Sequence, residues 1–318
     1  MCCLFGLLDY NNCFTPKQRE RILHVMAKEC EVRGTDATGI SYLSNHRMRV
    51  FKRAARGGFM RFHLPQDANI IMGHTRMTTQ GNARHNYNNH PFAGSTASGA
   101  FSLAHNGVLW NDSQLRKQLS LPSTKIETDS YIAVQLLEQE NSIDFQSLKK
   151  MAEAVEGQFT FTILDHANNL YIVKGQNPMA LYHFAKGFYL YASTEEILQK
   201  IVNRLGISKF PHFTIEITDG QILCIDAGGK RTFGSFEEKT YAYYNRYSFG
   251  YDNWLDRRSS HSTPLTDLLT TANNLGYSID DIVDLMDYGY YEEDIEDMLY
   301  RPELLEWAMI EMRSAVYG

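Results

Sequence analysis

The chain has 318 residues, of which 43% are hydrophobic and 21% are charged, as is typical of a soluble globular protein and not of a disordered or fibrous one. No apolar run approaches the roughly 20 residues that a membrane helix needs, and the start lacks the basic segment of a signal peptide, so we expect a cytoplasmic protein without a membrane span. The net charge of −6 at pH 7 argues against binding to nucleic acid, because its acidic residues would repel phosphate groups.

The first predicted element is a helix that begins after Thr15 and ends at Gly34. Thr15 and Gln18 have the spacing of a capping box, in which each satisfies a backbone or side-chain group of the other. Apolar runs then predict strands at residues 39–44, 48–53, 69–75 and 101–107. A second helix is predicted to begin with Thr128 as its N-cap and to extend to residue 139. This part of the chain therefore mixes helices with strands.

The next hundred residues are predicted to consist mostly of strands. Glycine or polar turns separate four of them, at residues 158–165, 169–175, 180–185 and 188–193. A capped helix over residues 193–206 follows, and residues 213–226 are predicted to form a hairpin that turns at Asp219 and Gly220. Runs of strands interrupted by helices, without strict alternation, indicate an α+β fold with largely antiparallel sheets.

A change in composition near residue 239 predicts a domain boundary. Residues 1–238 are the predicted main domain, residues 239–263 an aromatic-rich linker or wrap, and residues 264–318 a small acidic helical bundle. The last segment contains thirteen acidic residues and two arginines, so its net charge is −11, whereas residues 1–263 carry +5. This asymmetry indicates two units, and it makes the C-terminal region a candidate docking surface for a partner protein.

Cys2 is a candidate nucleophile, because removal of Met1 would leave it with a free α-amino group. An amine whose pKa is about 7.7–8 can take the thiol proton and later give a proton to departing ammonia. The simpler interpretation of one cysteine beside a start methionine is that it has no function. The other cysteines that we considered match no zinc-binding spacing and are interpreted as small apolar residues of the core: Cys13, Cys30 and Cys224.

Two further stretches supply the other groups that cleavage of an amide needs. Asn106 and Gly107 end a strand, where an amide side chain and an unobstructed backbone N–H can stabilise an oxyanion. The planar guanidinium of Arg76 suits the carboxylate of an amino acid, and the carboxylate of Asp129 suits its ammonium group. Two more side chains are expected to add hydrogen bonds to a substrate, those of Thr79 and Gln80. Each residue by itself has a structural interpretation, and it is the combination that predicts the chemistry.

Three histidines lie in or beside these stretches, namely His74, His90 and His105. Their spacing is not that of a helical metal site, and the sequence predicts no metal. We interpret each as a structural histidine whose hydrogen bonds are satisfied within the fold.

Six short motifs in a fixed order carry a resemblance to a known family. They are C-x-x-F-G, RGxDxxG, GHTRxxTxG, NxHPF, HNG and ETD, and the match covers about residues 2–235. Through them the chain resembles the class II glutamine amidotransferases, which are N-terminal-nucleophile hydrolases. The resemblance implies a four-layer αββα sandwich, to which the predicted C-terminal helical unit is added. The chain departs from the family pattern at Cys3, where glycine or serine is common, and at Met77, where an aromatic residue is common.

The resemblance also implies a reaction, the hydrolysis of the glutamine side-chain amide to glutamate and ammonia through a γ-glutamyl thioester. In that reaction Cys2 is both nucleophile and base, and Asn106 and Gly107 form the oxyanion hole. Arg76 and Asp129 anchor L-glutamine. No metal or organic cofactor is expected for this step.

The acceptor of the ammonia is not identified by the sequence. About 80 residues follow the family match, and they contain no glycine-rich phosphate-binding motif. We therefore expect either that the acceptor is a separate protein, for which the C-terminal region is a candidate docking surface, or that the products are simply glutamate and ammonia. Two alternatives stay open at this point. One is an amidase of the same fold that acts on another amide, and the other is a non-catalytic regulatory protein that binds glutamine.

Overall fold

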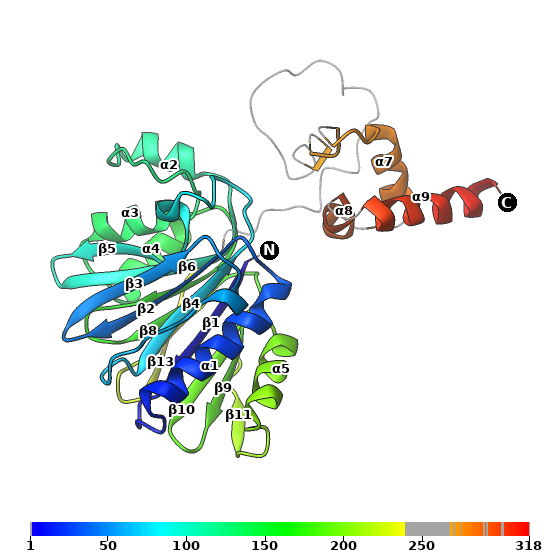
Figure 1. Cartoon of the computed structure of the whole chain (residues 1–318). Helices are drawn as coiled ribbons and strands as arrows, with labels where there is room; N and C mark the ends of the chain where they lie inside the picture. Colours follow the sequence, from blue (N-terminus) through cyan, green and yellow to red (C-terminus); the bar gives the residue numbers. More distant parts are fainter. Residues whose placement is uncertain are drawn as a thin grey trace. The chain divides into compact units, whose positions relative to one another are not determined.

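A computed structural model describes residues 2–238, 268–269, 271–273, 275–288, 290, 292–299 and 302–317 (Figure 1). Its internal contacts divide the chain into two compact units, Met1–Tyr241 and Ala242–Gly318, and each is described by itself. The predicted linker at 239–263 lies outside the described residues. Every helix in the described part of the chain is too short or too polar to cross a lipid bilayer.

The first sheet of the N-terminal unit places the start of the chain at its centre. Its seven strands are antiparallel and have the order β11-β9-β10-β1-β4-β2-β3. They are β1 (Cys3–Leu8), β2 (Ala37–Ser44), β3 (Arg47–Arg53), β4 (Ile70–Arg76), β9 (Ala180–Phe184), β10 (Phe188–Ala192) and β11 (His212–Thr214). Phe5 of β1 is opposite Gly73 of β4 on one side and Ala192 of β10 on the other. The residue that precedes β1 therefore lies at the end of a central strand, beside the end of β4.

The second sheet has six antiparallel strands in the order β13-β12-β8-β7-β6-β5. They are β5 (Phe92–Thr96), β6 (Gly99–Leu109), β7 (Gly157–Leu164), β8 (Leu170–Lys174), β12 (Gln221–Ile225) and β13 (Arg231–Ser235). Strand β6 carries the HNG motif, and Asn106 is opposite Thr160 of β7. The sequence predicted strands at β6, β7 and β8 but did not predict β5 or β13.

Helices cover the outer face of each sheet (Figure 1). Helices α1 (Pro16–Glu29) and α5 (Glu195–Leu205) pack on the first sheet, and α3 (Tyr131–Glu140) and α4 (Phe145–Ala154) pack on the second. A short helix, α2 (Asp112–Gln118), follows β6 and contacts α3. Neither α2 nor α4 was predicted from the sequence.

The alternation of side chains along β1 shows how four layers arise. Successive residues of a strand face opposite sides of the sheet. Phe5 and Leu7 are buried in a core with α1 and α5, whereas Leu4 and Leu8 are buried in a second core between the two sheets. A third core lies between the second sheet and its helices. The predicted four-layer αββα sandwich is therefore confirmed, and its two central layers are sheets that pack face to face.

Two predicted helix boundaries need correction. The capping box of Thr15 and Gln18 is present at α1, but the helix ends at Glu29 and a 3-10 turn over Cys30–Val32 follows, so Gly34 is not its cap. Thr128 does not cap α3, because the residue before that helix is Ser130, whose side chain makes no capping bond. The hydroxyl group of Ser130 instead contacts neighbouring side chains of the candidate site.

The prediction of a hairpin at residues 213–226 is wrong. Strand β11 pairs with β9 in the first sheet, whereas β12 pairs with β8 and β13 in the second, so the segment between them crosses from one sheet to the other. The amide of Gly220 donates a hydrogen bond to the carbonyl of Lys174 on β8. An apolar pattern indicates a strand without indicating its sheet, and short spacing led us to pair two strands that do not meet.

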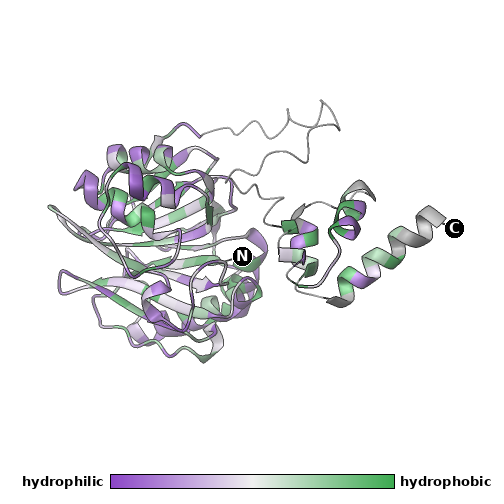
Figure 2. Cartoon of the chain, turned by 90° about the horizontal axis from the view of Figure 1, so that it is seen from above, coloured by the Kyte–Doolittle hydropathy of each residue, from purple (hydrophilic) through white to green (hydrophobic). Residues whose placement is uncertain are grey.

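The C-terminal unit has a small hydrophobic core of its own. Its described helices include α7 (Ile279–Tyr288), α8 (Glu292–Leu299) and α9 (Pro302–Tyr317). Its buried residues are Leu268, Ala272, Ile282, Leu285, Ile295, Leu299, Leu305, Ala308 and Met312. Figure 2 shows both hydrophobic and hydrophilic residues on these helices, as packing on one face requires.

Candidate active site

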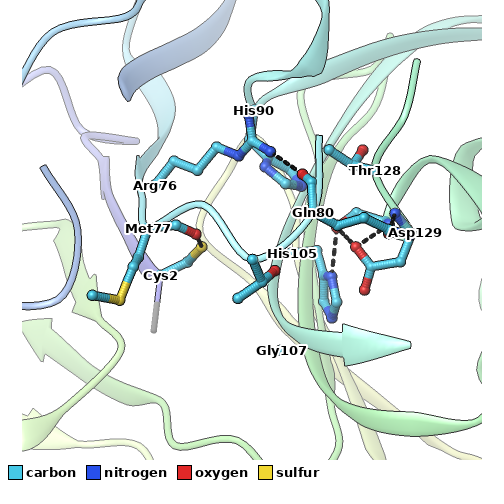
Figure 3. Close-up of a pocket in the computed structure, with 11 residues that line it drawn as sticks. Cys2, Arg76, Met77, Gln80, His90, His105, Gly107, Thr128 and Asp129 are labelled. Atoms are coloured by element: carbon cyan, nitrogen blue, oxygen red, sulfur yellow. Dashed lines mark hydrogen bonds between the residues drawn. The ribbon is translucent and has the colours of Figure 1, made fainter. Parts of the chain in front are cut away.

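A pocket lies where the start of β1 and the end of β4 approach β6 and the start of α3 (Figure 3). Six of the seven predicted site residues line it, namely Cys2, Arg76, Thr79, Gln80, Gly107 and Asp129. The other lining residues are Met77, His90, His105, Thr128 and Ser130. Residues from distant parts of the sequence therefore meet at one place, and the two sheets each contribute some of them.

Cys2 is held by two hydrogen bonds, one to its backbone carbonyl and one from its thiol. The Nε of Arg33 donates to the Cys2 carbonyl at 3.0 Å, and the Cys2 thiol donates to the Met77 carbonyl over 3.4 Å. Burial raises the pKa of the Cys2 thiol above its ordinary value, although the backbone of Met77 and the charge of Arg76 act in the opposite direction. The thiol is therefore protonated at neutral pH and needs a base before it can attack.

The RGxDxxG motif supports the segment that faces Cys2. The Asp36 amide donates to the Arg76 carbonyl at 3.0 Å, and the Asp36 carboxylate accepts from the amide of Thr78 at 2.7 Å. A Cβ on Gly34 would lie 2.5 Å from the carbonyl carbon of Arg76, so any larger residue would push this segment away. The motif thus fixes the chain as it leaves β4.

Arg76 is only 3% exposed, and its guanidinium is oriented by neighbours on one side. Its Nη1 donates to Asn89 Oδ1 at 2.7 Å, and its Nη2 donates to the Gln80 carbonyl. Nη2 also donates to the Gly81 carbonyl at 3.4 Å, and because a guanidinium has five N–H donors, these bonds still leave others for a ligand. Burial lowers the pKa of Arg76, and the negative charges of Asp36, Asp129 and Glu127 act in the opposite direction.

Asp129, at 5% exposure, is the second buried charge of the pocket. Its Oδ2 accepts from the amide of Leu109 at 2.7 Å, and its Oδ1 accepts from the amide of Ser130 at 2.8 Å. The amide of Asp129 donates to Gln80 Oε1 at 2.7 Å. Gln80 therefore bridges the two charged residues, since its carbonyl also contacts Arg76, and Figure 3 shows it between them.

Asn106 and Gly107 are held by the strand next to β6 and by a loop. Asn177 Nδ2 donates to the Asn106 carbonyl at 2.9 Å. Gly107 has a φ of +142°, and a Cβ there would lie 1.9 Å from the Gln158 carbonyl oxygen, so only glycine fits. The Asn106 side chain does not line the pocket, but it is fully buried and neither of its polar atoms has a hydrogen-bond partner in the described structure. It shares a face of β6 with Ala104, which packs between the sheets.

The two departures from the family pattern lie in different surroundings. Cys3 is fully buried with Phe5 and Leu7 in the core beneath α1, on the opposite side of β1 from the inter-sheet layer. It therefore occupies space outside the pocket. Met77 lines the pocket and is 44% exposed, and its carbonyl contacts the Cys2 thiol.

The prediction that all three histidines are satisfied is wrong for His90, and His74 Nδ1 and His105 Nε2 also have no partner among the described residues. His74 Nε2 donates to the His105 carbonyl at 3.0 Å, and His105 Nδ1 contacts Ser130 Oγ at 2.8 Å. His90 has no such bond at either ring nitrogen within the described residues. No group of three His, Cys, Asp or Glu side chains in this part of the chain could hold a metal ion. Sequence reasoning also missed Ser130 and Asn89, which contact Asp129 and Arg76. Asn89 occupies the variable position of the NxHPF motif, so the motif gave no signal for it.

Comparison with protein families relates this site to enzymes that use glutamine. Residues 74–200 match the model of a family described as glutamine amidotransferase domain. The chain is 27% identical to glutamine–fructose-6-phosphate aminotransferase from Geobacillus kaustophilus, over 71% of this chain and 36% of the relative. It is 29% identical to the enzyme of the same name from Bacillus licheniformis, over 64% of this chain and 34% of the relative. The chain thus spans about a third of the length of these curated relatives.

One solved structure has a fold similar to that of this chain. Glutamine phosphoribosylpyrophosphate amidotransferase from B. subtilis, complexed with ADP and GMP, matches with a TM-score of 0.58 and 18% identity. The match covers 74% of this chain and 49% of that one. At this level of identity the likeness shows a shared fold, and the family match and the aminotransferase relatives carry the relation to glutamine-dependent enzymes.

Proposed function

Because the chain contains a glutamine amidotransferase domain related to the class II enzymes, we propose that it hydrolyses the side-chain amide of glutamine to glutamate and ammonia, with Cys2 as the nucleophile. The observation that carries this proposal is the meeting of a thiol, a buried cation and a buried carboxylate in one pocket. Arg76 and Asp129 are buried opposite charges that line the same pocket, and they suit the two charged ends of a free amino acid.

The thiol becomes reactive when Met1 is removed. The α-amino group of Cys2 then takes the thiol proton, and the thiolate attacks the amide carbon of glutamine. The oxyanion that forms accepts hydrogen bonds from Asn106 Nδ2 and from the amide of Gly107. Asn106 supports this role, because its buried side chain has no partner in the described residues, and an unpartnered buried polar group costs about 1–3 kcal/mol until a ligand satisfies it.

The rest of the reaction needs no further group. The Cys2 ammonium protonates the amide nitrogen as the carbon–nitrogen bond breaks, which releases ammonia and leaves a γ-glutamyl thioester. Water, deprotonated by the same amine, then adds to the thioester carbon. The thiol leaves as glutamate forms, and the starting state returns.

The proposal is tested by glutamate release from L-glutamine, with protein that intact mass shows to lack Met1. We expect turnover by this protein, no turnover by Cys2→Ala, and no turnover by protein that retains Met1. Hydrolysis of another amide in preference to glutamine would instead support a different amidase. Glutamine binding without turnover in protein that lacks Met1 would support a non-catalytic regulator.

We also propose that the ammonia acceptor lies outside these 318 residues, on a separate protein that contacts the C-terminal unit. The support is the acidic C-terminal unit, which exposes Leu304, Trp307 and Ile310 on α9 and so offers a partner an apolar surface among negative charges. Purified protein should then release glutamate and ammonia in equal amounts, even with fructose 6-phosphate or phosphoribosyl pyrophosphate present. A deficit of ammonia relative to glutamate would indicate an acceptor within the chain.

A further inference from the structure

His90 is a buried imidazole with no hydrogen bond at either nitrogen to any described residue, although it is 4% exposed and lines the pocket. Burial lowers the pKa of His90 well below its ordinary value, and nearby positive charge adds to this effect. The ring is therefore neutral at pH 7, with one N–H donor and one acceptor nitrogen. Groups of this kind are nearly always paired in folded proteins, so the free imidazole needs a partner that the described residues do not supply.

The ring is held in place by its surroundings. Lys52 Nζ donates to the carbonyl of Pro91 at 2.9 Å and to that of Asn89, so the backbone is fixed on both sides of His90. The ring lies 4.2 Å from the His74 ring and 4.4 Å from the Phe92 ring, measured between centroids. Its nitrogens are thus presented in a fixed orientation and do not sample solvent.

Its position is at the Arg76 end of the pocket. His74 and Arg76 are two residues apart on β4, so their side chains share a face and are separated by roughly 6.6 Å along the strand. The His90 ring packs against the His74 ring at an angle of 36°, and the adjacent Asn89 accepts a hydrogen bond from Arg76. Figure 3 shows the His90 ring and the Arg76 guanidinium in the same part of the pocket.

The two histidines near His90 make hydrogen bonds within the protein. His74 donates to the His105 carbonyl, and His105 contacts Ser130, which in turn donates to Asp129. Each therefore has at least one bond inside the protein. His90 is the member of the three that both lines the pocket and has neither nitrogen paired within the described chain.

We propose that His90 binds substrate by donating its N–H to the α-carboxylate of glutamine, beside the guanidinium of Arg76. This inference rests on the proposed function. A neutral donor strengthens binding of the carboxylate without adding a second positive charge to a buried site. It also favours amino acids over simple amides, because an amide without the carboxylate would leave both Arg76 and His90 unpaired.

The test measures binding in a Cys2→Ala background, which separates it from turnover. Glutamine affinity is measured by calorimetry, with His90→Phe to remove the donor, His90→Gln to keep one, and His85→Phe as a control. His85 is an exposed histidine of the same loop outside the pocket. We expect His90→Phe to weaken binding about tenfold or more, His90→Gln to recover part of the loss, and His85→Phe to bind normally. Circular dichroism checks that each variant is folded.

A second ligand distinguishes direct contact from a structural role. In 4-aminobutanamide the amide and amine are kept and the carboxylate is absent, and its binding is followed by ligand-observed NMR. We expect His90→Phe and the parent to bind it equally. Equal glutamine affinity in all variants, or an equal loss for both ligands, would overturn the inference and leave the proposed function intact. Failure of the Cys2→Ala parent to bind glutamine would overturn the proposed function and the inference together.

Discussion

Replacing Gly107 with alanine should reduce both stability and turnover, because the backbone at this position has no room for a Cβ. The residue has a φ of +142°, and an added Cβ would lie 1.9 Å from the Gln158 carbonyl oxygen and 2.6 Å from Asn177 Nδ2. Relief of these contacts requires β6 to move away from β7 and Asn177 to give up its bond to the Asn106 carbonyl. The change therefore strains the fold and displaces the proposed oxyanion donors together.

The expected magnitude follows from these contacts. A non-glycine residue in this region of φ costs about 1–3 kcal/mol, and loss of one hydrogen bond adds about 0.5–1.5 kcal/mol, so the free energy of unfolding should fall by about 2–4 kcal/mol. Displacement of one oxyanion donor should lower kcat by about 10²–10³. Urea unfolding measures the first effect, and glutamate release by protein that lacks Met1 measures the second.

Gly206→Ala is the matched control. Gly206 ends α5 with a φ of +71°, and a Cβ there would meet nothing within 4 Å. It should cost about 1–2 kcal/mol and leave kcat unchanged. If Gly107→Ala were no less stable than Gly206→Ala and kept its kcat, the reasoning about the close approach of β7 would be refuted.

Three further changes test other parts of the structure. Arg76→Lys keeps the charge but loses the planar fork, so the KM for glutamine should rise about 10- to 100-fold in initial-rate assays; an unchanged KM would contradict the proposed carboxylate contact. Asp9→Asn should lower the free energy of urea unfolding by about 3–5 kcal/mol, because the fully buried carboxylate pairs with Arg19 at 2.9 Å, and a much smaller loss would argue against that pair. Burial lowers the pKa of His105 to about 4, below the 6.5 of the unfolded chain, so the unfolded state takes up the proton first and stability should decline as pH falls from 6.5 to 4. The slope of Tm against pH should be smaller in His105→Gln, and equal slopes would count against this explanation.

Local signals in the sequence predicted much of the fold. The capping box at Thr15 and the apolar runs of β2, β4 and β6 depend on neighbouring residues, and these elements were found with small errors at their ends. The resemblance to the amidotransferases then supplied the four layers, which no local pattern contains. The hairpin at 213–226 failed, because which sheet a strand joins is decided by contacts with residues far away in the sequence.

The candidate site was predictable as a set of residue types and less so as a set of contacts. The motifs identified six residues that do line one pocket. The bridging position of Gln80 and the unpaired ring of His90 depend on the path of the loop at residues 77–91. The sequence of a loop has no periodic pattern from which that path could be predicted. A motif therefore located these residues but could not assign their partners.

The central place of β1 has a consequence for the timing of synthesis. Its neighbour β4 ends at residue 76, but its other neighbour, β10, ends at residue 192, and the Leu4 amide donates to the side chain of Ser193. At about 5–20 residues per second, a ribosome needs about 10–40 s to reach that point. Throughout this interval the first strand lacks one flank, so an aminopeptidase can act on Met1 before β10 joins β1. The position of one strand in the chain thereby gives time for Met1 to be removed from the proposed nucleophile before the sheet is complete.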